Sequence, residues 1–159
     1  GTKPKRVLTI EKLMGLATLI VVPVEIASII LYPKLTLLEC LKNCPALQWA
    51  GLAISAAGVC FFITAMLTMA DSWRAGIPEN DKTAFVQRGI YRISRNPAFV
   101  GFDLMYIGLL MAFPNIIHLI FALFPVVMLH LQIRQEEVFC RNAFGPEYEE
   151  YCLRVRRYL

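Results

Sequence analysis

Four long apolar runs occupy most of this chain of 159 residues and restrict the folds that it can adopt. They cover about residues 8–31, 46–70, 98–113 and 116–133. At about 1.5 Å of helical rise per residue, the first two runs can cross a hydrocarbon core of about 30 Å, whereas the third spans it only marginally. With a hydrophobic content of 57%, these runs predict an all-α, polytopic transmembrane helical bundle of about four spans.

The third and fourth runs are separated by little more than Pro114-Asn115, a pair that favours a tight turn over a continued helix. We therefore expect an antiparallel helical hairpin. The first run is longer than the core of a cleavable signal peptide, so we expect it to remain in the protein. The simplest partition is one membrane domain over residues 1–159, with two spans in about 8–70 and the polar loop, the hairpin and a C-terminal helix in 71–159.

Positive charge is distributed unevenly between the two sides of such a bundle. With four spans, one side receives 14 of the 16 Lys and Arg residues, and the other receives only Lys34 and Lys42. This split predicts that both termini and the loop at 71–96 are cytoplasmic, in the plasma (inner) membrane if the source is prokaryotic. The net charge of +4 then needs no nucleic-acid partner, although it favours contact with anionic membrane lipids.

The five cysteines show no CxxC pair and no histidine at metal-ligand spacing, so we predict no metal site. Two acids, Glu25 and Asp103, lie within apolar runs, where a charge is costly unless it is paired or solvated. Each is therefore a functional candidate. The alternatives are a hydrogen-bonded helix contact for Glu25 and interfacial water for Asp103.

Polar and aromatic residues concentrate in the loop before the third run. Tyr91 is an interfacial anchor or a ligand contact, and Gly89 gives the backbone freedom near it. Pro97 suits the first turn of a helix, which leaves Arg95 and Asn96 beside the helix N-terminus. Free backbone N–H groups at that end favour a carboxylate or a hydroxyl-rich ligand.

The fourth run ends in a second polar cluster. On a helix, His130, Arg134, Glu137 and Arg141 share a stripe, and Gln132 and Glu136 form a further pair at a spacing of four. Adjacent carboxylates at a membrane boundary repel each other, so a nearby cation or a donor-rich ligand would stabilise them. The alternative is a solvated helix end.

The residues from Pro146 onwards predict an amphipathic helix. Its aromatic face contains Tyr148, Tyr151, Cys152, Val155 and Tyr158, and its acidic and basic residues lie mostly opposite. Such a helix either lies on the membrane surface or folds back as a lid over the two polar clusters. The periodicity does not choose between these placements.

In this order along the chain, these motifs resemble those of the isoprenylcysteine carboxyl methyltransferase family, particularly its short prokaryotic members. The resemblance covers about residues 71–158. It rests on Gly89-x-Tyr91, Arg95-Asn96-Pro97-x-x-x-Gly101, Glu136-Glu137, Phe144-Gly145-x-x-Tyr148-x-x-Tyr151 and Val155-x-Arg157. The sequence departs from the common pattern at Asn96, Phe99 and Cys140, where His, Tyr and Leu are usual.

The resemblance implies an enzyme that transfers a methyl group from S-adenosyl-L-methionine, held in a cytoplasm-facing pocket. Arg134 and Glu137 are the implied catalytic residues, with Arg134 or Gln132 facing the acceptor. The residues implied in cofactor binding are Val86, Tyr91, Arg95, Asn96, Pro97, Val100, Gly101, Gln132, Glu136, Tyr148 and Tyr151.

The replacement of His by Asn96 favours either an acceptor that is already deprotonated or a binding role alone for the usual His. A carboxylate acceptor is already anionic and needs no general base, which agrees with Asn96 in place of His. An amine or hydroxyl acceptor would need Glu136, Glu137 or His130 to remove a proton. Sideways access from the bilayer predicts a lipidic or lipidated substrate.

Two other classes of function remain open, and the sequence leaves the oligomeric state open as well. One is an NADPH-dependent enzyme similar to the membrane sterol reductases, with Arg88, Arg92 and Arg95 holding phosphates. The other is a non-catalytic membrane scaffold.

Overall fold

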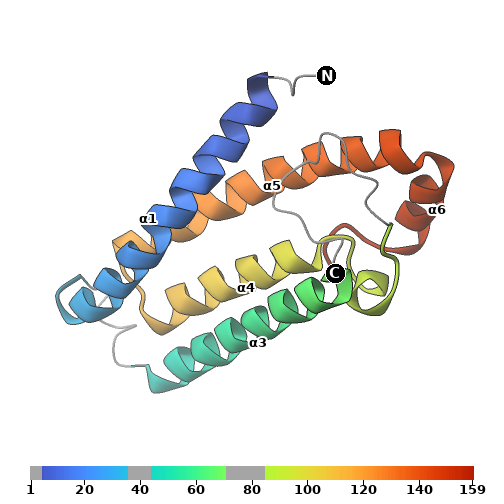
Figure 1. Cartoon of the computed structure of the whole chain (residues 1–159). Helices are drawn as coiled ribbons and strands as arrows, with labels where there is room; N and C mark the ends of the chain where they lie inside the picture. The colour runs from blue at the N-terminus through green and yellow to red at the C-terminus, as the bar shows by residue number, and fades with distance from the viewer. Residues whose placement is uncertain (1–4, 36–43, 71–84) are drawn as a thin grey trace.

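The protein is described here by a computed structural model, which describes residues 5–35, 44–70 and 85–159. All regular structure in these ranges is helical. The elements are α1 (Lys5–Leu35), α3 (Pro45–Met69), the short 3-10 helix η2 (Gly89–Arg92), α4 (Pro97–Ala112), α5 (Ile116–Phe144) and α6 (Pro146–Arg154). Helices α3, α4 and α5 lie side by side, α1 crosses α5 at the hairpin end, and α6 packs at the other end of α5 (Figure 1).

Two of these helices, α3 and α5, are long and apolar enough to cross a membrane. The apolar part of α1, Leu19–Ile30, and the whole of α4 are shorter. The all-helical class is therefore confirmed for the described residues, whereas the count of four spans stays a prediction. Helix α5 continues beyond the apolar run that ends at residue 133, because its polar C-terminal part keeps helical hydrogen bonding as far as Phe144.

Helices α3 and α4 pack in antiparallel directions through glycines. A Cβ atom added at Gly58 would lie 2.5 Å from the carbonyl oxygen of Gly101, and one added at Gly51 would lie 2.5 Å from that of Gly108. No real side chain tolerates such distances, so the two backbones approach each other as closely as glycine permits. This contact fixes the start of α4 against the end of α3.

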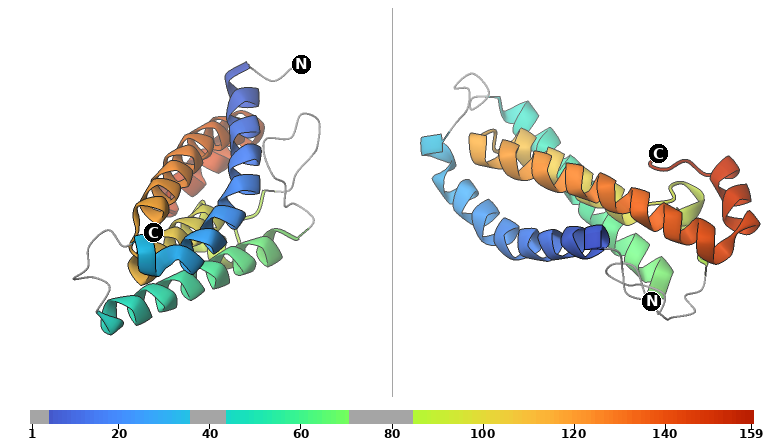
Figure 2. Two further views of the ribbon diagram at one scale, coloured as in Figure 1. Left: turned by 90° about the vertical axis from the view of Figure 1, so that its left-hand side faces the viewer. Right: turned by 90° about the horizontal axis from the view of Figure 1, so that it is seen from above.

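The predicted hairpin is present: α4 ends at Ala112, α5 begins at Ile116, and the two helices run in opposite directions (Figure 2). Asn115 caps α5, since its side-chain oxygen accepts a hydrogen bond of 2.9 Å from the backbone N–H of His118. This turn also holds α1. Ser28 donates to Asn115 Oδ1 at 3.2 Å, and Glu25 forms an ion pair with His118.

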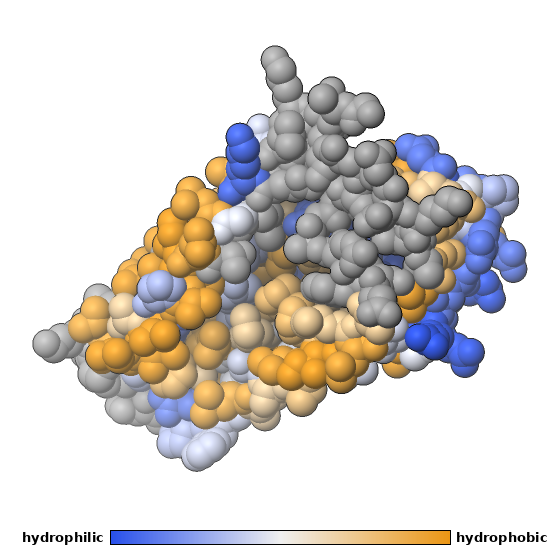
Figure 3. Space-filling view, in the orientation of Figure 1, coloured by the Kyte–Doolittle hydropathy of each residue, from blue (hydrophilic) through white to orange (hydrophobic). Residues whose placement is uncertain are grey.

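The surface separates into an apolar belt and a polar end. Large side chains such as Leu19, Ile30 and Leu67 are more than 70% exposed, and orange apolar surface covers much of the helical bundle in Figure 3. Blue surface gathers at the end formed by α6. Exposed apolar area on this scale suits a membrane protein, in which lipid covers the belt and water reaches the polar end.

The C-terminal segment folds back onto the bundle. Gly145 has a φ of +54°, a conformation that glycine adopts easily, and it redirects the chain from α5 into α6. Residues 155–159 then return toward the start of α4 (Figure 1). The predicted helix is therefore shorter than its aromatic pattern suggests: it ends at Arg154, Val155 is extended, and Tyr158 lies outside it.

Candidate functional site

The start of α4 is held against α3 by the short segment that contains η2. Helix η2 buries Ile90 and Tyr91, which pack with Ala65 of α3 and Ala98 of α4. Gly89 has a φ of +59°, so the chain can turn sharply into η2. The polar residues from Ser94 to Asn96 are thereby placed at the polar end of the bundle.

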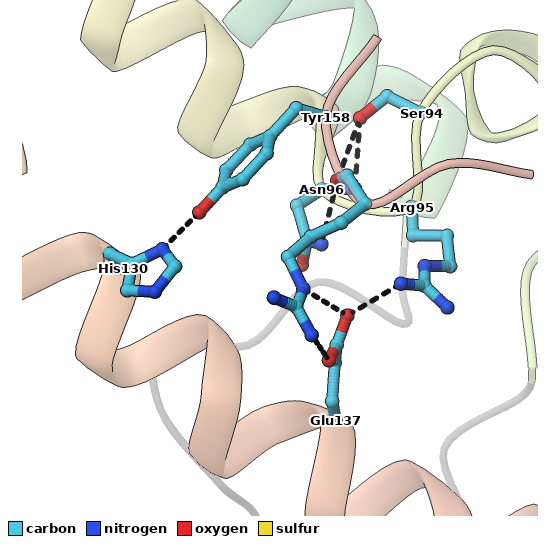
Figure 4. Close-up of polar contacts among 7 residues, drawn as sticks. Ser94, Arg95, Asn96, His130, Glu137 and Tyr158 are labelled. Carbon is cyan, nitrogen blue, oxygen red and sulfur yellow. Dashed lines mark hydrogen bonds and ion pairs between the residues drawn. The ribbon is translucent and has the colours of Figure 1, made fainter. Parts of the chain in front are cut away.

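A buried carboxylate lies opposite this segment. Glu137 of α5 is bound by two guanidinium groups, as Figure 4 shows. Arg95 Nη2 lies 3.0 Å from Glu137 Oε1, and Arg157 donates through Nε to Oε1 at 3.0 Å and through Nη2 to Oε2 at 2.7 Å. Both carboxylate oxygens are therefore engaged, and the three groups together carry one net positive charge.

The backbone of the C-terminal tail is bound to the start of α4. The N–H of Arg95 donates to the carbonyl of Arg156 at 2.9 Å, and Asn96 Nδ2 donates to the carbonyl of Arg157 at 3.0 Å. Ser94 Oγ donates to the same Arg157 carbonyl at 3.4 Å. Asn96 occupies the N-cap position of α4 but makes no side-chain cap hydrogen bond. Its side-chain amide binds the C-terminal tail instead of capping the helix.

Aromatic side chains of α6 pack against Phe85 and the end of α5, and Tyr151 reaches η2 through a hydrogen bond. Tyr148, Tyr151 and Val155 are buried, and the Tyr151 hydroxyl donates to the carbonyl of Tyr91 at 2.5 Å. Burial raises the pKa of Tyr151 to about 12, and burial, Tyr151 and Glu136 together raise that of Tyr91. These phenols are neutral at physiological pH. Of the two placements open to the C-terminal helix, the structure has the one that folds back.

Other polar residues of α5 make separate contacts. Gln132 Nε2 donates to Glu136 Oε1 at 2.8 Å, which confirms the pairing predicted from their spacing. His130 Nδ1 shares a hydrogen bond with the hydroxyl of Tyr158 in the tail (Figure 4). Arg134, by contrast, is exposed. The four residues of the predicted stripe therefore do not act as one group.

One polar atom in this region stands out. Arg95 is nine-tenths buried, and its Nε–H has no hydrogen-bond partner among the described residues. A buried donor without a partner is costly, so a ligand that accepts this hydrogen bond would be stabilised. The described residues contain no group of three or more His, Cys, Asp or Glu side chains suited to a metal ion.

Most residues predicted for the site are found near one another, at the polar end of the bundle. Val86 packs against the cluster of Ile90 and Tyr91, and Pro97 and Val100 are buried in the first turns of α4. Gly101 faces α3, where it makes the close contact with Gly58. Residues 71–84 of the predicted polar loop lie outside the described residues.

Three residues of this region were absent from the predicted site: Ser94, Arg157 and Tyr158. Arg157 belongs to the Val155-x-Arg157 motif, but its partner Glu137 is distant in sequence and no local pattern connects the two residues. Of the two acids in apolar runs, Glu25 lies at the other end of the bundle with His118. Asp103 has a buried Oδ1 without a hydrogen-bond partner in the described ranges.

Comparison with known proteins gives consistent matches. A family model described as phospholipid methyltransferase matches residues 47–147, which includes nearly all of α3 and the whole of α4 and α5. The chain is also 30% identical over 151 residues to protein-S-isoprenylcysteine O-methyltransferase B of Arabidopsis thaliana, covering 93% of this chain and 74% of that protein.

Two further relatives are named probable protein-S-isoprenylcysteine O-methyltransferases, from the indica and japonica subspecies of Oryza sativa. Each is 33% identical over 76 residues, which cover 47% of this chain. The chain spans only 40% of the length of these rice proteins.

Proposed function

Because this chain belongs to the isoprenylcysteine carboxyl methyltransferase family, we propose that it is an S-adenosyl-L-methionine-dependent membrane methyltransferase acting on a lipidic or lipidated carboxylate. The observation that carries the proposal is the arrangement of Arg95 and Asn96 opposite Glu137 at the polar end of the bundle. The family motifs and the buried polar groups coincide there.

The donor set fits the chemistry of the proposed cofactor. S-adenosyl-L-methionine has a carboxylate, an ammonium group and ribose hydroxyls. The Nε–H of Arg95, which has no partner in the described part of the chain, is a suitable donor for the carboxylate. Glu136 is a suitable acceptor for the ammonium or the hydroxyls. Buried aromatic groups, Tyr91 and Tyr151 among them, supply apolar surface next to these charges.

When bound, S-adenosyl-L-methionine supplies a methyl group activated by its positive sulfur. The residues of this chain then have three tasks: to bind, to align and to exclude water. We propose that Glu137 keeps Arg95 and Arg157 in place, since both of its oxygens are already engaged. The net positive charge of this group attracts an anionic acceptor, which needs no proton removed.

We further propose that the polar end faces the cytoplasm, with both termini on that side, and that the acceptor approaches from the bilayer. The apolar belt places lipid beside the helices that build the site. Arg134 is exposed near this end, where it is available to the head of an acceptor. The isoprenylcysteine named in the relatives is an acceptor of this kind.

Isothermal titration calorimetry on the purified chain in detergent tests the proposal. We expect saturable binding of S-adenosylhomocysteine and no binding of NADPH. Binding of NADPH without S-adenosylhomocysteine would favour a reductase and overturn the proposal. If neither molecule binds, a scaffold function is favoured.

A further inference from the structure

We propose that Arg157 is a positioning residue for the methyl transfer, an inference that rests on the proposed function. Through its side chain and its backbone carbonyl, Arg157 holds the polar part of α5 and the start of α4 in a single arrangement. It acts on ligand binding through Glu137, Arg95 and Asn96.

The side chain of Arg157 orients the carboxylate of Glu137, which Arg95 also contacts. Its planar guanidinium makes two hydrogen bonds to the carboxylate, at 3.0 and 2.7 Å, while Arg95 makes one contact at 3.0 Å. The two-bond geometry orients the carboxylate as well as binding it. Without Arg157, Glu137 would have Arg95 as its one cationic partner among the described residues, and Arg95 could change its contact with it.

The backbone of the same residue determines the conformation of Asn96. The Arg157 carbonyl accepts from Asn96 Nδ2 at 3.0 Å and from Ser94 Oγ at 3.4 Å, while Asn96 itself does not cap α4. Asparagine is among the residues most favoured as an N-cap, so its side chain has an available alternative at the helix start. The tail keeps it from that alternative, so the first turn of α4 has no cap from Asn96 and its N–H groups favour an anionic ligand.

Through these contacts Arg157 connects the C-terminal tail to α5 and to the start of α4, which are far apart in the sequence. If the side chain of Arg157 no longer binds Glu137, the tail keeps its contacts through Arg156 and Tyr158, but the carbonyl that orients Asn96 is no longer fixed relative to α5 by the same residue. The Nε–H of Arg95 and the start of α4 then lose their relative placement. A ligand that uses both would bind less tightly even though the helices remain packed.

The test compares substitutions in the tail by calorimetry with S-adenosylhomocysteine, with thermal unfolding as a measure of folding. Arg157→Gln removes the charge, Arg157→Lys keeps the charge without the fork, and Arg156→Gln is the matched control because that side chain is exposed. We expect about ten- to a hundredfold weaker binding for Arg157→Gln at a similar unfolding temperature. Arg157→Lys should be intermediate, and Arg156→Gln should change binding less than about twofold.

A double-mutant cycle separates positioning from direct contact. If Arg157 acts through Glu137, Glu137→Gln combined with Arg157→Gln will weaken binding much less than the sum of the two single effects. Additive effects would overturn the inference, as would wild-type affinity in both Arg157 variants. In either case binding by the wild-type chain would leave the proposed function intact. A wild-type chain that binds no S-adenosylhomocysteine would overturn the proposed function, and the inference with it.

Discussion

Glu137 and Arg157 form a two-bond ion pair between α5 and the C-terminal tail, with N–O distances of 3.0 and 2.7 Å. The carboxylate is almost fully buried, whereas the Arg157 side chain is 37% exposed. Because Arg95 contacts the same carboxylate, this pair joins three segments at the polar end of the bundle. The site is therefore completed by residues from the last part of the chain.

Asn96 is tested by its replacement with Ala and with His. Asn96→Ala removes the donor to the Arg157 carbonyl, so we expect about two- to tenfold weaker S-adenosylhomocysteine binding. Asn96→His keeps an N–H donor and should stay within about threefold of wild type. Calorimetry measures both, with Asn142→Ala on the exposed face of α5 as the control. Equal affinity for the Ala variant and wild type would exclude Asn96 from the site.

Glu136 is expected to contribute a charged hydrogen-bond acceptor to the cofactor. Glu136→Gln should weaken S-adenosylhomocysteine binding about ten- to a hundredfold, because hydrogen bonds to charged groups are worth about 1.5–3 kcal/mol. Glu150→Gln on the exposed face of α6 is the control. Retention of wild-type affinity by Glu136→Gln, measured in the same titration, would remove Glu136 from the proposed site.

We expect a methyl group added in the contact between α3 and α4 to destabilise the protein. Gly58→Ala places a Cβ atom 2.5 Å from the Gly101 carbonyl, and the overpacking should cost about 1–3 kcal/mol of stability. Gly15→Ala on α1 meets nothing within 4 Å and should be neutral or stabilising by up to about 1 kcal/mol. Unfolding of the detergent-solubilised protein compares the two. The prediction fails if Gly58→Ala is as stable as Gly15→Ala.

The ion pair of Glu25 and His118 is expected to hold α1 on the hairpin. Removing one partner leaves a buried polar group without its counterpart, so His118→Ala should destabilise the protein by about 3–5 kcal/mol. Replacing both, as Glu25→Leu with His118→Leu, should cost less than His118→Ala alone, because no charge is then left unpaired. Unfolding in detergent measures stability in each variant. A double variant less stable than His118→Ala would contradict this explanation.

Tyr151 predicts a specific sensitivity to alkaline pH. Its pKa is raised from 10.0 to about 12 by burial, so the folded state favours the neutral phenol that donates to Tyr91. The resulting stabilisation is fully present below about pH 10 and is lost as pH rises through about 12. Unfolding temperatures from pH 8 to 12 should therefore fall less steeply for Tyr151→Phe, which is about 1 kcal/mol less stable at pH 7. Parallel curves for the two proteins would show that Tyr151 does not contribute to this loss.

Much of the helical architecture is predictable from the sequence because it depends on neighbouring residues. The apolar runs correspond to α1, α3, α4 and α5, and Pro114-Asn115 marks the turn of the hairpin. The pairing of Gln132 with Glu136 follows from one turn of helix. Such features need only hydrophobic periodicity and local backbone geometry.

Other features depend on which surfaces meet. The stripe predicted on α5 divides in the structure, since His130 contacts Tyr158, Glu137 contacts the two arginines and Arg134 is exposed. The glycines of α3 and α4 do not stabilise either helix on its own, and the close antiparallel contact between the two helices explains why they are there. Periodicity identifies a polar or a small face of a helix, but it does not identify the partner of that face.

The sequence by itself determined the helices, the apolar belt, the hairpin and the family motifs, because each of these is specified by residues close together in the chain. Only the tertiary structure decided that the C-terminal helix folds back, that Arg157 reaches Glu137 and that Asn96 serves the tail instead of capping α4. Those outcomes depend on the burial of α6 aromatic groups against Phe85 and the end of α5, on the hydrogen bond from Tyr151 to Tyr91, and on charges that meet only after the helices pack. Long-range contacts of this kind leave no periodic signal in the sequence.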